Sequence, residues 1–101
     1  MHDIFCRLGF RKRARVLDLS VGGCRLELPR RRGSAFTQGQ PIITVLDAPE
    51  GQLALEGRVA WVTGAPRGGE LVGIQFVGID EPKRLTLHML AMAHKEALTI
   101  A

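Results

Sequence analysis

Five short segments with the residue pattern of β-strands, separated by turns rich in glycine and proline, constrain the fold of this chain most strongly. Residues 24–28 show the pattern clearly, because apolar side chains alternate there with Arg25 and Glu27, as in a half-buried strand. Consecutive short strands joined by such turns favour an antiparallel barrel, which closes its own edges. We therefore expect an all-β fold, a barrel of about five to six strands. The other strands are predicted at residues 15–20, 41–47, 52–63 and 70–77.

The longest predicted strand, residues 52–63, indicates which side chains should face the core. Leu55, Val59 and Trp61 fall on one parity, whereas charged side chains fall on the other. We expect the apolar set to face the barrel interior. Gly57 lies on the same parity, and a missing side chain at that point indicates a bulge or a sharp bend.

The end of the chain changes from strand to helix pattern. Asp80 is followed by Glu81 and Pro82, an N-cap acid with proline in the first turn. Leu85, Met89 and Met92 then recur at helical spacing, and we expect the broad apolar stripe that they form with the flanking Leu87, Leu90, Ala91 and Leu98 to pack on the barrel. A stripe that contains methionine can also dock a partner, which is the alternative use.

A chain of 101 residues is long enough for one hydrophobic core but not for two. We divide the single domain into three parts by their patterns. They are a basic N-terminal arm at residues 1–15, a barrel at residues 16–79 and a helix at residues 80–98 that packs on the barrel.

Positive charge is concentrated in the first third of the sequence. Residues 1–33 hold nine Lys and Arg against three Asp and Glu, a net charge of +6, whereas residues 34–101 hold five against seven, a net charge of −2. Such a block attracts phosphates, whether on a nucleotide, a nucleic acid or an anionic membrane. A solvated basic face without a specific partner is the plainer alternative.

The motifs of an enzyme or a metal site are missing from the sequence. His88 and His94 are six residues apart, so they do not share a helix face as an i, i+4 metal pair would. There is no glycine-rich phosphate loop before a helix and no nucleophile elbow. We therefore expect no catalytic residues, no metal and no cofactor.

Cysteine usage and hydropathy predict a cytoplasmic protein. Cys6 and Cys24 lack the CxxC spacing of metal and redox motifs, and two lone cysteines fit a reducing compartment. No apolar run approaches the roughly 18 residues that a membrane span needs. The N-terminus is too interrupted for a signal peptide, so we expect neither export nor a membrane span.

Residues 16–23 read as a strand that runs into a tight turn containing Asp18, Ser20, Gly22 and Gly23. Asp and Ser side chains can bond the backbone two residues on, and glycine can supply a positive φ. The purely structural interpretation is a turn that only reverses the chain. The functional one is a ligand site, in which a carboxylate accepts from a guanine edge and a hydroxyl with nearby amides holds phosphate oxygens.

Arginines four residues apart precede this turn. Arg7 and Arg11 have this spacing, as do Arg11 and Arg15. A guanidinium can fork onto a phosphate or onto guanine O6 and N7, and its flat face can stack on a purine. In so arginine-rich a segment the spacing also arises by chance.

The sequence resembles the PilZ domain family, bacterial receptors for the second messenger cyclic di-GMP. Residues 18–23, DLSVGG, look like the family's (D/N)xSxxG signature. Residues 26–29, 57–62 and 73–76 look like its later strands, and Asp80-Glu81 like the start of its closing helix. The resemblance covers residues 11–98 and implies a six-stranded antiparallel barrel with a C-terminal helix.

The resemblance also implies a ligand and a site. In the family an RxxxR motif on an N-terminal arm binds cyclic di-GMP together with the signature turn. Carried over to this chain, the arginine pair is Arg7 and Arg11. The turn residues are Asp18, Ser20, Gly22 and Gly23.

The chain departs from the family pattern at its start. A strand and its turn usually separate RxxxR from the strand that carries the aspartate, but only residues 12–17 separate Arg11 from Asp18. Six residues are too few for two strands and a turn. We expect either that the first strand is absent and another chain completes the barrel, or that the chain is a divergent member.

Three functions are compatible with these features. The first is a module that binds cyclic di-GMP, orders its arm and passes the signal to a protein partner. The second is a degenerate PilZ-like adaptor that binds only protein, through its helix or an unpaired barrel edge. The third, nucleic-acid binding, is disfavoured because the chain has no Tyr and one Trp for base stacking, so we expect no DNA or RNA partner. A homo-oligomer is compatible with each.

Overall fold

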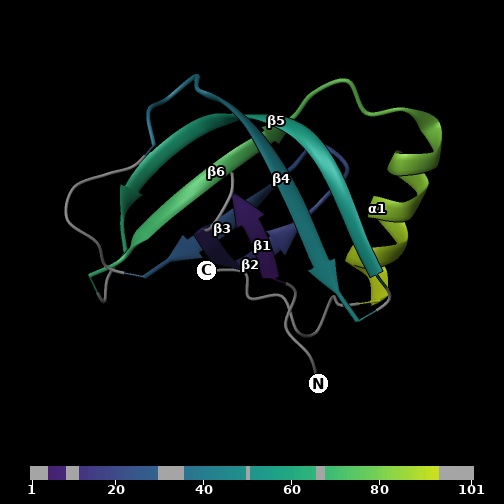
Figure 1. The fold of residues 1–101 in the computed structure, drawn as a ribbon, viewed down its shortest axis with the longest axis horizontal. Helices are drawn as coiled ribbons and strands as arrows, with labels where there is room; N and C mark the ends of the chain where they lie inside the picture. Colours follow the sequence, from purple (N-terminus) through teal and green to yellow (C-terminus); the bar gives the residue numbers. More distant parts are fainter. Residues whose placement is uncertain (1–4, 9–11, 30–35, 50, 66–67, 94–101) are drawn as a thin grey trace.

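A computed structural model describes residues 5–8, 12–29, 36–49, 51–65 and 68–93. Within these ranges the chain forms a six-stranded antiparallel barrel and one helix (Figure 1). The strands lie around the closed barrel in the order β1-β2-β3-β6-β5-β4. The elements are β1 Phe5–Leu8, β2 Lys12–Leu19, β3 Gly23–Leu28, β4 Pro41–Ala48, β5 Gly51–Gly64, β6 Glu70–Phe76 and α1 Glu81–Ala93.

Strand β1 excludes one of the two expected alternatives, namely that the first strand is absent and another chain completes the barrel. It lies inside the segment that we assigned to an arm, pairs with β2 on one side and with β4 on the other, and so closes the barrel within one chain. Leu8 is the register partner of Lys12, so a short connection is enough to join the two strands. The strand escaped sequence analysis because it has only four residues, too few for a strand periodicity to show.

The predicted strands are found, with β2 beginning three residues earlier than expected, at Lys12. Inward-facing side chains from all six strands form the core, in which Leu26, Leu46 and Val72 are fully buried. Thr44 is the buried polar residue among the described core, and its hydroxyl donates to the Leu55 carbonyl at 3.1 Å. This hydrogen bond removes the cost of burying the hydroxyl.

The predicted bulge in β5 exists, but it lies between Val59 and Trp61 instead of at Gly57. A Cβ at Gly57 would come within 2.8 Å of the Ile74 side chain and 2.9 Å of the Gln75 carbonyl. Gly57 therefore allows β6 to approach β5 closely. The close approach of another backbone is a common reason for glycine in a strand, as are a bulge and a sharp bend.

Helix α1 begins as expected and packs on the barrel with one side of the expected apolar stripe. The Lys83 N–H donates to the Asp80 carboxylate at 3.0 Å, which is an N-cap hydrogen bond. The face toward the barrel consists of Leu87 and Leu90, which are buried. These two residues belong to the broad stripe that we expected to pack, but its other members Leu85, Met89 and Met92 are exposed, at 61%, 61% and 60%.

Both helix faces have helical spacing, so periodicity alone could not choose between them. Residues 94–98 of the predicted helix lie outside the described residues. No helix in the described ranges is long and apolar enough to cross a membrane.

Candidate functional site

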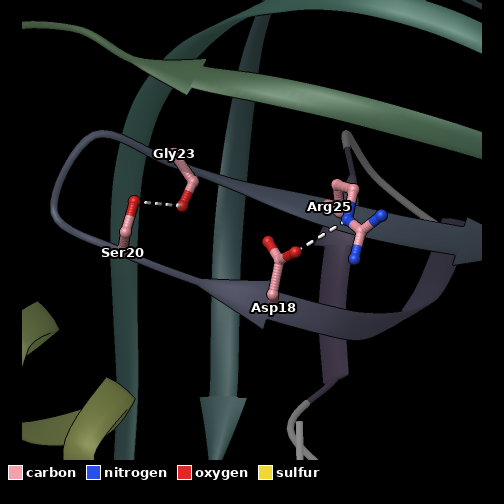
Figure 2. A network of polar contacts seen from close by, with 4 residues as sticks. All are labelled: Asp18, Ser20, Gly23 and Arg25. Atoms are coloured by element: carbon pink, nitrogen blue, oxygen red, sulfur yellow. Dashed lines mark hydrogen bonds and ion pairs between the residues drawn. The ribbon is translucent and has the colours of Figure 1, made fainter. Parts of the chain in front are cut away.

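The turn between β2 and β3 is held by its own serine (Figure 2). The Ser20 N–H donates to the Gly23 carbonyl at 2.9 Å, and the Ser20 hydroxyl donates to the same oxygen at 3.4 Å. The Gly22 N–H donates in turn to the Ser20 hydroxyl at 3.2 Å. The Phe76 N–H donates to the Gly22 carbonyl at 2.9 Å, which ties the turn to β6. Ser20 is therefore a structural residue of the turn as well as a candidate ligand contact.

The glycines of the turn are needed for a reason other than the positive φ that we predicted. Neither Gly22 nor Gly23 is among the positive-φ glycines of the described chain. A Cβ at Gly23 would collide with the Ile74 carbonyl of β6, whereas a Cβ at Gly22 would have Ser20 Oγ as its nearest neighbour, at 3.9 Å. Gly23 thus lets β3 and β6 lie in close contact.

This difference predicts unequal effects of two adjacent substitutions. Gly23→Ala should lower the free energy of unfolding by roughly 1–3 kcal/mol, because the added methyl group overpacks the contact with β6. Gly22→Ala, the matched control, should change it by less than about 0.5 kcal/mol. Chemical denaturation of the two variants measures both values, and equal losses would contradict the proposed role of Gly23.

The carboxylate of Asp18 is paired with a cation that sequence analysis did not select. The Arg25 Nε donates to Asp18 Oδ2 at 2.7 Å, and the two side chains are 24% and 38% exposed respectively (Figure 2). A bulge between Val16 and Asp18 accounts for the orientation of Asp18. Val16 and Leu17 are buried in succession, so the alternation shifts by one residue and Asp18 reaches the outer face.

Arg25 also has neighbours on its other side. It is the register partner of Gly73 on β6, and Gly73 is the register partner of Trp61 on β5. A Cβ at Gly73 would collide with the indole ring, so Trp61 lies over Gly73. Directly opposed residues in antiparallel strands share one face, so Asp18, Arg25 and Trp61 form a row across the outside of the barrel.

Trp61 corrects another sequence prediction. We expected it to face inward with Leu55 and Val59, but it is on the outside and 38% exposed. The bulge between Val59 and Trp61 shifts the alternation, so that Val62 packs against the core instead. Arg25 alternates with apolar residues in its strand, and this pattern could have identified it in the sequence as an outward-facing residue. Nothing in the sequence locates the bulge that turns Trp61 outward.

The arginines of the segment that we assigned to an arm are placed partly in the barrel wall. Arg7 lies in β1 opposite Arg13 of β2 and Val45 of β4, and Arg11 lies outside the described residues. Arg13 precedes Asp18 by five residues, about 16 Å along an extended strand. The backbone thus keeps Arg7 at the far end of β2 from the turn.

Cys24 lies close to the turn, in β3, but is not a candidate nucleophile. Burial raises the pKa of the Cys24 thiol, and the nearby Cys6 and Asp18 raise it further. Cys24 therefore stays protonated at neutral pH and is not a nucleophile. The described residues contain no group of three or more His, Cys, Asp or Glu side chains that could hold a metal ion.

The sequence matches a known domain family, and the fold matches solved structures. A family model of the PilZ domain matches residues 7–93. The PilZ domain with c-di-GMP of YcgR from Escherichia coli is similar in structure, with a TM-score of 0.77 and 14% sequence identity over 97% of this chain and 89% of that one. The inhibitor of motility MotI/DgrA from Bacillus subtilis gives a TM-score of 0.72 and 16% identity, over 95% of this chain and 48% of that one. No curated protein matches the sequence.

Proposed function

Because this chain belongs to the PilZ domain family, we propose that it is a receptor for cyclic di-GMP. The ligand binds on the outer face of the barrel, at the turn from Asp18 to Gly23. The observation that carries this proposal is the row of Asp18, Arg25 and Trp61, which offers an acid, a cation and an aromatic surface side by side. The similar PilZ domain of YcgR, which has c-di-GMP in its structure, supports the same ligand.

Each side chain in the row has a defined chemical task toward a guanine base. The Asp18 carboxylate accepts from the N1–H and exocyclic amine of guanine. Arg25 uses its Nε for Asp18, and its two terminal NH₂ groups can donate to guanine O6 and N7 or to a phosphate. The indole of Trp61 provides a surface on which a base stacks.

The phosphates of the ligand are attracted by the arginines of β2 and its neighbours. Arg13 and Arg15 are exposed on the outer side of β2, and Arg7 lies across from Arg13 in the register. Their positive charge raises the local concentration of an anionic dinucleotide. In this proposal Arg7 and Arg11 belong to the attracting basic region, while the contacts to the base come from the row.

Isothermal titration calorimetry tests the proposal, with cyclic di-AMP and GTP as controls. We expect saturable binding of cyclic di-GMP and binding of cyclic di-AMP weaker by at least about tenfold, because adenine lacks the N1–H donor for Asp18. Asp18→Ala should remove this preference while leaving the fold intact. Equal affinity for both dinucleotides would contradict the assignment of Asp18, and no heat with any of them would contradict the function.

A second function, adaptor binding to protein, is favoured by the outer stripe of α1. Leu85, Met89 and Met92 form an apolar surface on the side of the helix away from the barrel. Methionine adapts to varied partner surfaces, and an amphipathic helix can insert its apolar face into a groove. This role would be supported if a Leu85→Asp, Met89→Asp double variant folds but no longer binds a protein partner found for the wild type.

A further inference from the structure

The first half of β5 has a strand on only one side. Strand β4 pairs with residues 51–58, whereas β6 pairs with residues 57–64. After Phe76, the Val77 N–H still donates to the Glu56 carbonyl at 3.0 Å, and the chain then turns at Gly78, whose φ is 63°. Among the residues that the structure describes, no strand lies beside Gln52–Leu55 on this side.

The hydrogen bonds of β5 show which main-chain groups face the open side. The Leu55 carbonyl accepts from Thr44 of β4, so its groups point toward β4. The Glu56 carbonyl points the other way, toward the line of β6. Because these groups alternate along a strand, the N–H and C=O of Gln52 and Ala54 point to the open side. Unpaired groups of this kind are a template for another strand.

A groove lies beside this edge. It has a volume of about 320 Å³ and is lined by β5, by Val77–Ile79 after β6, and by Lys83 of α1. A neighbouring hollow of about 390 Å³ shares Ile43, Glu56 and Val77 with it. Ile43 is 52% exposed, which adds an apolar surface on β4. Figure 1 shows the first half of β5 running next to α1, with the connection from β6 arching over to the helix.

We propose that this edge binds an extended segment of a protein partner as an added strand that continues the line of β6. Alternate donors and acceptors at strand spacing are complementary to an extended peptide backbone and to no compact small molecule. The groove favours apolar side chains at every second position of that segment, near Val77 and Ile79. This inference is independent of nucleotide binding.

The charge at one end of the groove sets a further preference. Lys83 is half-buried in the groove wall and makes no ion pair with the residues that the structure describes. An acidic side chain on the bound segment would pair with Lys83 when it lies at that end of the groove, away from Glu56, which also lines the groove. The partner segment is therefore an extended peptide with alternating apolar residues and one acid near the N-terminus of α1.

The test uses a displayed library of random octapeptides selected on the wild-type protein, followed by synthesis of the enriched peptides. The variant that separates the outcomes is Ala54→Pro. Proline removes the N–H that faces the open side and no hydrogen bond to β4, a position where an edge strand tolerates it. The matched control, His88→Ala, alters an exposed residue of α1 and leaves the β5 edge unchanged.

We expect enrichment of peptides with alternating apolar residues and an acid. Ala54→Pro should weaken their binding at least tenfold, His88→Ala should not, and hydrogen exchange at the Gln52 and Ala54 amides should slow when peptide is bound. If Ala54→Pro does not fold, the wild-type protein is titrated instead with peptides that are N-methylated at alternate amides. Methylation of the set of amides that faces β5 should abolish binding, and methylation of the other set should not. Failure to enrich any peptide, or binding that is insensitive to Ala54→Pro and to N-methylation, would overturn the proposal.

Discussion

Leu87→Ala is expected to lower the free energy of unfolding by about 2–5 kcal/mol, which is the range for deleting a fully buried leucine side chain. Leu87 is 0% exposed and belongs to the same core cluster as Leu26 and Leu46. Its truncation leaves a cavity where α1 meets the barrel, and the closed barrel can collapse around it only in part. Urea denaturation followed by circular dichroism measures the loss.

The matched control for this prediction is Leu85→Ala. Leu85 is on the same helix but 61% exposed, so its truncation should cost less than about 0.5 kcal/mol. The comparison decides which face of α1 packs on the barrel, because both residues are leucines two positions apart. A larger loss for Leu85→Ala than for Leu87→Ala would mean that the stripe of Leu85, Met89 and Met92 is the packed face.

Arg25→Ala is expected to weaken cyclic di-GMP binding by about 30- to 100-fold. Hydrogen bonds to charged groups contribute roughly 1.5–3 kcal/mol. In the proposed site Arg25 supplies the donors to the ligand, and it is also the partner that orients Asp18, at 2.7 Å. The effect on folding should be within about 1 kcal/mol, because Arg25 and Asp18 are 24% and 38% exposed and solvent screens the pair.

Two further variants separate the geometry of Arg25 from its charge. Arg25→Lys keeps the positive charge but loses the planar fork, so it should recover only a small part of the affinity. Arg84→Ala removes one positive charge from α1, where Arg84 is exposed, and should leave the affinity within about twofold. If Arg84→Ala weakened binding as much as Arg25→Ala, net charge alone would explain the effect.

The parts of the fold that sequence analysis predicted are those with long periodic patterns. Strands β3 to β6 and the start of α1 at Asp80 were located, because alternation over many residues and an N-cap acid are local signals. The resemblance of residues 18–23 to a family signature also identified the turn correctly as a distinct feature. The reason for the two glycines at the end of the turn was predicted incorrectly. Gly23 is required by its close contact with Ile74, on a strand far along the chain, and not by a positive φ.

The errors have a common physical origin in contacts that are distant in sequence. Strand β1 is stabilised by pairing with β4, and the inward face of α1 is chosen by the barrel it meets. Bulges in β2 and β5 turn Asp18 and Trp61 outward, and the registers of four strands then bring them into one row with Arg25. None of these features follows from the residues near them in the chain.

Strand β5 carries both proposed sites. Trp61 lies in its second half, in the row with Arg25, and the open edge at Gln52–Leu55 lies in its first half. The two sites therefore use different stretches of one strand, and each can be altered without touching the other. Variants at Ala54 and at Arg25 should accordingly affect peptide binding and nucleotide binding separately.

The most direct test of the central claim is the fluorescence of Trp61 during titration with cyclic di-GMP. Trp61 is the single tryptophan of the chain, and it lies in the proposed row. If a guanine base stacks on the indole, the emission should change and saturate at the same ligand concentration as the calorimetric heat. Unchanged emission at saturating ligand would place any binding away from the row of Asp18, Arg25 and Trp61, and would contradict the account.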